Sequence, residues 1–211
     1  GGDGCLRLWD AASGDLLLTM REPMGFVRSC VFSPDGRRLL SASGEGSVRL
    51  WDAMTGEEIF TLSRHSLWVD SGAFSPDGRA LLSAGADGRL ELWDATTGET
   101  VMATRRQDVW VRSCAFSPAG RRLLSATSDG HLWLWDAANG ESLLKLNTHQ
   151  GWVNCALFAP DGNHMLSAGE DGSVRLWDAI SGKELMTLYG HDGWIWSCAF
   201  SPDGRSLISA G

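Results

Sequence analysis

The hydrophobic and polar positions of this chain form short alternating runs, and turn residues separate the runs. In one such run, Leu90 and Leu92 face one way and Glu91 faces the other, which is typical of a β-strand. Three further runs of this kind are residues 68–74, 79–84 and 99–104. Gly, Pro and Asp residues between the runs are typical of tight turns. We therefore predict four short strands in residues 68–104.

The same unit recurs along the whole chain at a fixed spacing. A Trp-Asp pair ends the third run of each unit and stands every 42 residues, at 9–10, 51–52, 93–94, 135–136 and 177–178. A period of this size indicates an array of like units. A helical repeat is disfavoured, because no segment has the 3.6-residue period and Gly or Pro interrupts each run. Four-stranded antiparallel sheets must stack to bury their faces, and stacking around an axis gives an all-β propeller.

The repeat predicts a single propeller domain, or a propeller fragment, over residues 1–211. Its complete blades are predicted at residues 26–62, 68–104, 110–146 and 152–188. Two strands from 194–211 and two from 1–20 would form a composite blade that joins the termini, which makes five blades. The alternative is an open piece of a larger ring or array, and the first residue is not Met, so the native length stays open. A closed ring predicts a monomer, and an arc predicts self-association through its sheet edges.

Several recurring motifs, taken together, identify a family. They are the Trp-Asp pairs, the Ser-Pro-Asp-Gly turns at 33–36, 75–78 and 201–204, the Ser-Ala pairs that begin at 41, 83, 125, 167 and 209, and Gly190-His191. With them the chain resembles the WD-repeat β-propeller family over its whole length, and its gapless copies look like recently amplified bacterial or fungal arrays. The resemblance implies first strands that line the propeller axis. It says little about function, because propellers serve many roles.

The resemblance also implies a buried tetrad of hydrogen-bonded residues in each blade: a His before the first strand, a Ser, the Asp of an Asp-Gly turn and the Trp of Trp-Asp. The tetrads are His65, Ser83, Asp87 and Trp93; His149, Ser167, Asp171 and Trp177; and, across the two ends, His191 and Ser209 with Asp3 and Trp9. Pro23 and Gln107 replace the His in two repeats, and we expect those blades to be looser. A Ser-His-Asp catalytic triad is the alternative, but the pattern recurs in every blade without a nucleophile motif, so we predict a structural role.

Two columns of residues at the start of the first strands are candidates for partner binding. The first column is aromatic and contains Phe26, Trp68, Trp110, Trp152 and Trp194. The second column is chemically mixed and contains Arg28, Asp70, Arg112, Asn154 and Trp196. We expect both columns at the mouth of the channel, on the face that carries the His and Asp-Gly loops, which we call the channel-mouth face. The aromatic column fits core packing as well as partner anchoring, whereas the mixed column favours recognition, since Trp and Arg dominate interface hot spots.

Composition narrows the possible functions. The net charge of −8 argues against binding to nucleic acid or an anionic membrane, which needs clustered Lys and Arg. Cys30, Cys114 and Cys198 share one repeat position with Gly72 and Ala156, so a Cys there reads as a small core residue. A disulfide is disfavoured, because equivalent positions in successive repeats should lie too far apart. This favours a reducing, cytoplasmic location. The absence of a CxxC or P-loop motif gives no support for a metal or a nucleotide, and we predict no cofactor.

These observations predict a non-enzymatic scaffold that binds a peptide or protein surface on the channel-mouth face. One alternative is an excised or engineered propeller with no evolved ligand, because the copies are gapless. A propeller enzyme is the alternative from another class. It is disfavoured, because such enzymes place paired carboxylates or metal ligands on long, unequal loops, whereas every loop here is equally short.

Overall fold

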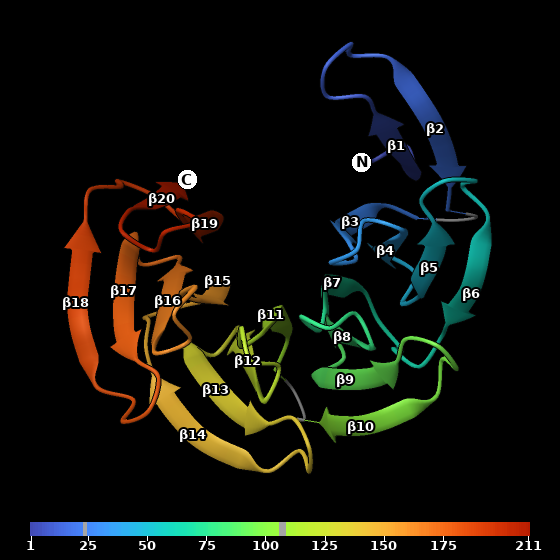
Figure 1. Cartoon of the computed structure of the whole chain (residues 1–211). Helices are drawn as coiled ribbons and strands as arrows, with labels where there is room; N and C mark the ends of the chain where they lie inside the picture. The colour runs from blue at the N-terminus through green and yellow to red at the C-terminus, as the bar shows by residue number, and fades with distance from the viewer. Residues whose placement is uncertain (23–24, 106–108) are drawn as a thin grey trace.

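The computed structural model describes residues 1–22, 25–105 and 109–211, and all regular structure in these residues is β (Figure 1). The strands are β1 (Cys5–Trp9), β2 (Leu16–Arg21), β3 (Val27–Phe32), β4 (Arg38–Ser43), β5 (Val48–Asp52), β6 (Glu58–Leu62), β7 (Val69–Phe74), β8 (Ala80–Gly85), β9 (Arg89–Asp94), β10 (Thr100–Arg105), β11 (Val111–Phe116), β12 (Arg122–Thr127), β13 (His131–Asp136), β14 (Ser142–Asn147), β15 (Val153–Phe158), β16 (His164–Gly169), β17 (Ser173–Asp178), β18 (Glu184–Tyr189), β19 (Ser197–Phe200) and β20 (Leu207–Ala210). The predicted all-β class is confirmed. No helix in the described residues is long and apolar enough to cross a membrane.

Successive strands pair in chain order to form the blades. The four-stranded sheets among the described residues are β3–β6, β7–β10, β11–β14 and β15–β18, and all of their strand pairs are antiparallel. The turns between the strands need glycine: Gly78 has a φ of 70° and Gly88 has a φ of 76°, a region that side chains with a Cβ rarely adopt. The predicted four-stranded blades are therefore confirmed.

The hydrophobic core lies between neighbouring blades. The first strands β3, β7, β11, β15 and β19 follow one another along the inner side of the arc (Figure 1). At one joint, Leu82 and Leu90 of the β7–β10 blade pack with Val111 and Leu123 of the next blade, and all four are almost fully buried. A blade that has a neighbour on either side is covered in this way on both faces of its sheet. Each joint therefore depends on residues of two repeats.

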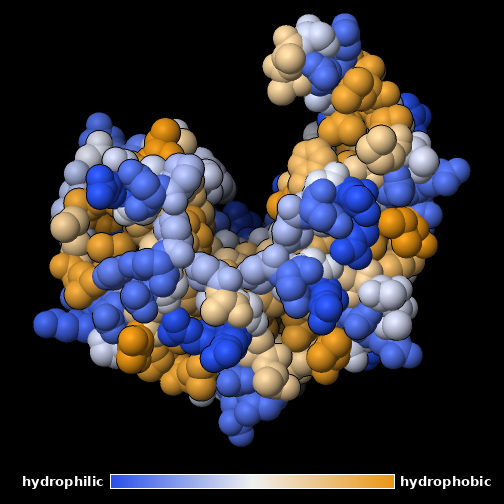
Figure 2. Space-filling view, viewed as in Figure 1, coloured by the Kyte–Doolittle hydropathy of each residue, from blue (hydrophilic) through white to orange (hydrophobic). Residues whose placement is uncertain are grey.

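The two ends of the chain form separate half-blades. The N-terminal half-blade is the two-stranded sheet β1–β2, and the C-terminal half-blade is the two-stranded sheet β19–β20. The sequence correctly divides one blade between the ends, but within the chain the two halves do not pair to complete it. They lie on opposite sides of a gap in the ring, because the blades do not turn far enough to bring them together (Figure 1). The gap also stays open in the space-filling view (Figure 2). The structure is thus the open arc rather than the closed ring.

Candidate functional site

The first complete tetrad joins four parts of one blade. His65, from the loop before β7, lies with Nδ1 2.9 Å from Asp87 and with Nε2 2.8 Å from the Ser83 hydroxyl. The Trp93 indole donates to the same hydroxyl at 2.9 Å. Because a carboxylate only accepts, the His65 proton belongs on Nδ1, and Ser83 donates to Nε2. The tetrad therefore ties the His loop to β8, to the β8–β9 turn and to β9.

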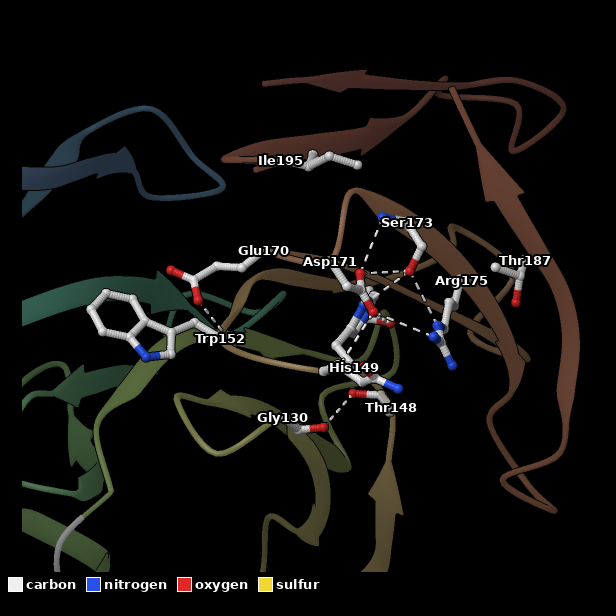
Figure 3. A network of polar contacts seen from close by, with 12 residues as sticks. Gly130, Thr148, His149, Trp152, Glu170, Asp171, Ser173, Arg175, Thr187 and Ile195 are labelled. Carbon is white, nitrogen blue, oxygen red and sulfur yellow. Dashed lines mark hydrogen bonds and ion pairs between the residues drawn. The ribbon is translucent and has the colours of Figure 1, made fainter. Parts of the chain in front are cut away.

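The second complete tetrad repeats this geometry two blades further on, and Figure 3 shows its His149 and Asp171. His149 lies 2.8 Å from both Asp171 and Ser167, and Trp177 donates to Ser167 at 3.0 Å. Burial lowers the pKa of His149 and outweighs the opposing effect of Asp171. Burial would raise the pKa of Asp171, but hydrogen bonds from His149 and Ser173 lower it to about 2. At neutral pH the tetrad therefore holds a neutral imidazole and an ionised carboxylate.

The burial of the serines decides what these tetrads can do chemically. Ser83 and Ser167 are both 0% exposed, and each hydroxyl is already engaged by a His and a Trp. A substrate cannot reach either oxygen, so the arrangement does not act as a hydrolase triad. Its geometry instead fastens each His loop to the blade that follows it.

The tetrad predicted across the termini is only half present. His191 Nε2 lies 2.8 Å from Ser209, as in the complete tetrads. Asp3, however, forms an ion pair with Arg7 at 2.6 Å, and the side chain of Trp9 is 54% exposed. The structure therefore does not bring Asp3 and Trp9 to His191, because they belong to the other half-blade.

In one of the two repeats that lack the His, another residue takes its place in the tetrad, and the sequence did not predict it. Glu22, one position before Pro23, accepts a hydrogen bond from Ser41, and Ser41 accepts one from Trp51 at 2.9 Å. The side chain of Glu22 is 0% exposed and forms an ion pair with Arg49, which also pairs with Glu45 at 2.8 Å. Glu22 thus takes the place of the His, and this joint is not left without a partner for Ser41.

The other repeat that departs from the pattern is described in part. Pro23 and Gln107 lie outside the described residues. Ser125 accepts a hydrogen bond from Trp135 at 2.9 Å, as the equivalent serines do from their tryptophans. The Trp–Ser half of the tetrad is therefore present in this blade.

Three members of the aromatic column form a contiguous row on the channel-mouth face. The rings of Trp68 and Trp110 lie 5.8 Å apart, and those of Trp110 and Trp152 lie 5.4 Å apart. The members nearer to the chain ends are more exposed: Phe26 is 60% and Trp194 is 52% exposed. The first pair is edge to face and the second is tilted, and this arrangement both packs the joints and leaves ring surface in contact with solvent.

The mixed column occupies β-bulges at the start of four first strands. The pairing register shifts across Arg28, Asp70, Arg112 and Asn154, so each of these is the extra residue of a bulge. Bulges re-aim side chains and are common beside functional sites. Trp196, which has no bulge described, is 51% exposed and packs against Trp194 at 5.7 Å.

Each arginine of this column reaches over to the following blade. Arg28 lies 4.7 Å from the centre of the Trp68 ring and 2.7 Å from Asp70. Arg112 repeats this with the next blade, 4.9 Å from the Trp152 ring and 3.3 Å from Asn154. The two columns therefore form one surface in which arginines stack on tryptophans.

Asp70 is the buried acidic group of this surface. Its side chain is 7% exposed, and one carboxylate oxygen, Oδ1, is held by Arg28. Burial raises the pKa of Asp70, and the charges of Arg28 and Arg112 partly offset that effect. The second oxygen, Oδ2, is buried without a hydrogen-bond partner among the described residues.

The cysteines correct one expectation from the sequence. Cys155 and Cys198 stand at positions that differ by one between repeats, and their sulfur atoms lie 2.9 Å apart across the joint to the C-terminal half-blade. The distance argument holds for equivalent positions but does not apply to this offset pair. All five cysteines are free thiols in the structure. In the described residues, no group of three or more His, Cys, Asp or Glu side chains is placed to hold a metal ion.

Comparison with known proteins identifies the repeat. The family described as "WD domain, G-beta repeat" matches residues 14–52, 56–94, 99–136, 140–178 and 182–211. Each complete match covers the last strand of one blade and the first three strands of the next, so the sequence repeat itself joins neighbouring blades. An uncharacterized WD repeat-containing protein of Synechocystis sp. is 40% identical over 43 residues, which are 20% of this chain and 12% of that protein. Because the family matches recur in phase with the blades over most of its length, the chain belongs to the WD domain, G-beta repeat family.

Proposed function

We propose that this chain is a non-enzymatic interaction scaffold that binds a peptide or protein surface on the channel-mouth face. The observation that carries the proposal is the row of Trp68, Trp110 and Trp152, with Arg28 and Arg112 stacked on it from bulged strands. Membership of a family whose domains generally serve as interaction scaffolds supports the same conclusion. Trp and Arg are the residues most enriched in interface hot spots.

The chemistry of this surface suggests what a partner would present. The exposed ring faces fit an apolar or aromatic side chain, and the two guanidinium groups fit a carboxylate or a backbone carbonyl. A short peptide segment offers both kinds of group together. Binding of nucleic acid or membrane is not part of the proposal, and a cytoplasmic location is part of it, on the cysteine pattern of the sequence.

A displayed library of random peptides tests the proposal. Peptides selected on the immobilised chain are measured against a variant with Arg28→Ala, Arg112→Ala and Trp196→Ala. We expect affinity to fall by about tenfold or more, since the variant removes three side chains of the hot-spot type. Circular dichroism and a thermal melt establish that the variant is folded.

A matched control removes the same charge elsewhere. Arg37, Arg79 and Met54 are exposed at the opposite ends of the blades, so Arg37→Ala, Arg79→Ala and Met54→Ala together should leave affinity unchanged. Equal loss in both variants, or no loss in either, contradicts the proposed surface. Turnover in a panel of hydrolase substrates with added metal ions would contradict a non-enzymatic role.

A further inference from the structure

The end of each blade opposite the channel-mouth face carries the Ser-Pro-x-Gly turns, and we call it the turn face. Strand β7 runs from the channel-mouth face to the turn face. Its first residue pairs with Gly85, beside the Asp-Gly turn, and its last residue pairs with Leu81, beside the Ser-Pro-Asp-Gly turn. A pocket opens on the turn face between the β7–β10 and β11–β14 blades. Its lining includes Asp77, Ala80, Leu92, Phe116, Gly120 and Ala137.

The preceding joint shows what fills the equivalent space. There, Arg38 reaches from β4 to the next blade and donates to the carbonyl oxygens of Gly78 at 2.7 Å and Ala95 at 3.1 Å. Its guanidinium carbon lies 5.7 Å from the centre of the Phe74 ring. Two carbonyl acceptors and an aromatic ring therefore hold the planar group.

The joint after the pocket repeats the same arrangement. Arg122 donates to the carbonyl oxygens of Gly162 and Ala179, both at 2.7 Å. Its guanidinium carbon lies 5.6 Å from the Phe158 ring. The same receptor for an arginine side chain is thus built twice in this molecule.

At the joint between these two, the arginine is missing but its receptor is present. Ala80 stands at the repeat position of Arg38 and Arg122, and the opposite wall is formed by the equivalents of the residues that hold those arginines, namely Phe116, Gly120 and Ala137. Ala80 therefore lines this pocket where Arg38 and Arg122 stand at the other two joints.

The backbone around this pocket has the same geometry as at the filled joints. The φ of Gly120 is 71°, against 70° at Gly78 and 68° at Gly162. The amide of Ala137 donates to the carbonyl oxygen of Arg121 at 3.0 Å, and the amide of Ala95 donates to the carbonyl oxygen of Arg79 at 2.8 Å. The backbone hydrogen bonds beside the pocket are therefore those of the filled joint.

The spacing between the blades is also the same. A Cβ built on Gly120 would lie 3.5 Å from Pro76, and one built on Gly78 would lie 3.6 Å from Pro34. The blades thus have not closed up around the small side chain of Ala80.

The lining contains one carboxylate among the described residues, that of Asp77. The Ser75 hydroxyl and the Arg79 backbone N–H hold the pKa of Asp77 below its ordinary value, so the carboxylate is ionised. Arg79 is exposed at the rim. Arg37 and Arg121 occupy the same position beside the two filled joints, so this neighbouring charge is compatible with a bound guanidinium group.

We propose that the Ala80 pocket binds a guanidinium group, such as the end of an arginine side chain, between Phe116 and the carbonyl oxygens of Gly120 and Ala137. A guanidinium group presents several N–H donors in one plane and can reach both carbonyl oxygens while it lies on the ring. An ammonium group is a compact, strongly hydrated charge and cannot match this geometry.

The test uses N-acetyl-arginine amide as the probe and N-acetyl-lysine amide as the matched control, followed by NMR of backbone amides. The arginine probe should give a saturable shift of the Gly120 and Ala137 signals, and the lysine probe should bind at least tenfold more weakly. Ala80→Arg places an arginine from within the chain and should abolish the shift. A thermal melt shows whether this variant is folded.

A second variant supports the test independently of Ala80→Arg. Arg38→Ala creates the same vacancy at the first joint, so it should gain a second saturable response at Gly78 and Ala95. Equal binding of both probes, an unchanged response in Ala80→Arg, or no saturable shift overturns the proposal. None of these outcomes affects the proposed function, because that surface lies at the other end of the blades.

Discussion

Among single residues, Glu22 has the most consequences for the joints between blades. Its carboxylate is fully buried, accepts from Ser41 and pairs with Arg49, whose own pKa burial lowers. Glu22→Gln keeps the shape of the side chain but removes the charge that Arg49 faces. We expect the free energy of unfolding to fall by about 1.5–3 kcal/mol, the range for hydrogen bonds to a charged group. Urea denaturation measures it.

Glu58 provides the matched control for that variant. It lies 3.4 Å from the same Arg49, but its side chain is 41% exposed. Glu58→Gln should therefore cost less than about 1 kcal/mol, because water screens exposed ion pairs. Equal costs for the two variants would show that burial of Glu22 does not matter.

The lowered pKa of His149 predicts how the stability of the fold depends on pH. Burial lowers its pKa below the ordinary value of 6.5, so the unfolded chain binds this proton more readily than the folded chain does. Stability should therefore fall as the pH drops from about 7.5 to about 5, by up to about 1.4 kcal/mol per pH unit. The lowered pKa of Asp171 adds stability that is lost as the pH falls from about 3.8, the ordinary value, through about 2, which lies below this window. Denaturation curves at a series of pH values measure the slope.

His149→Gln removes the titrating group from the same buried position. The variant should be less stable overall, but its stability should depend less steeply on pH over that window. An unchanged slope would mean that other groups carry the pH dependence of the native protein.

The residues that the sequence predicts well are those that recur in phase. The positions of His65, Ser83, Asp87 and Trp93 follow from comparison of the repeats, and the structure brings these residues together. Glu22 could not be found in this way, because it stands one position out of phase with the His it replaces. Glu91 was missed for another reason: its alternation with Leu90 and Leu92 reports the two faces of a strand, but a blade with a neighbour on either side buries both faces, and Glu91 is 0% exposed.

At the scale of strands and turns, the Asp-Gly turns act as contacts between blades. The carbonyl oxygen of Gly130, in the β12–β13 turn, accepts hydrogen bonds from the amides of Thr148 at 2.9 Å and His149 at 3.1 Å. It also accepts one from the Thr148 hydroxyl at 2.9 Å (Figure 3). Gly130 has a φ of 82°, and an added Cβ would lie 2.2 Å from the His149 carbonyl oxygen. This turn therefore leaves no space for a side chain.

Gly36, in the β3–β4 turn, is a second glycine that can be compared with Gly130. It has a φ of 69°, but a Cβ there would meet nothing within 4 Å. Gly36→Ala should cost about 1 kcal/mol from the left-handed backbone alone. Gly130→Ala should cost about 1–3 kcal/mol more, because the blades must move apart. Similar melting temperatures for the two variants would show that the contact at Gly130 is not rigid.

The sequence predicts the strands and turns but not the bulges. The extra residue at Arg28, Asp70, Arg112 and Asn154 is present in every complete repeat, so it leaves no insertion that comparison of the repeats could detect. Its effect on register appears only when the partner strand is placed opposite, as at Val69 and Ser71. The candidate surface could therefore be predicted as two columns, whereas the stacking of each arginine on the next blade could not.

For the whole molecule, the sequence assigns two strands to each end but does not fix the angle between blades. That angle comes from the packing of one sheet on the next, and it leaves β1 and β20 on opposite sides of the gap (Figure 1). The two edges remain complementary, because β4 and β5 pair with Ser41 opposite Arg49, and the equivalent pair would be Ser209 opposite Arg7. Exposed edges of matching register favour pairing between copies.

We therefore expect the isolated chain of residues 1–211 to self-associate through its half-blades. Ile208 is 69% exposed, whereas Leu40, its equivalent in a complete blade, is 1% exposed. Multi-angle light scattering on a sizing column should give a mass above that of one chain that rises with concentration. Ile208→Lys should shift the protein towards the monomer, because a charge cannot be buried in the joint without cost. Ile180→Lys changes a residue that is 73% exposed on the β17–β18 turn and should leave the mass unchanged. A monomer at every concentration, or equal effects of the two lysines, would show that the half-blades do not pair between copies.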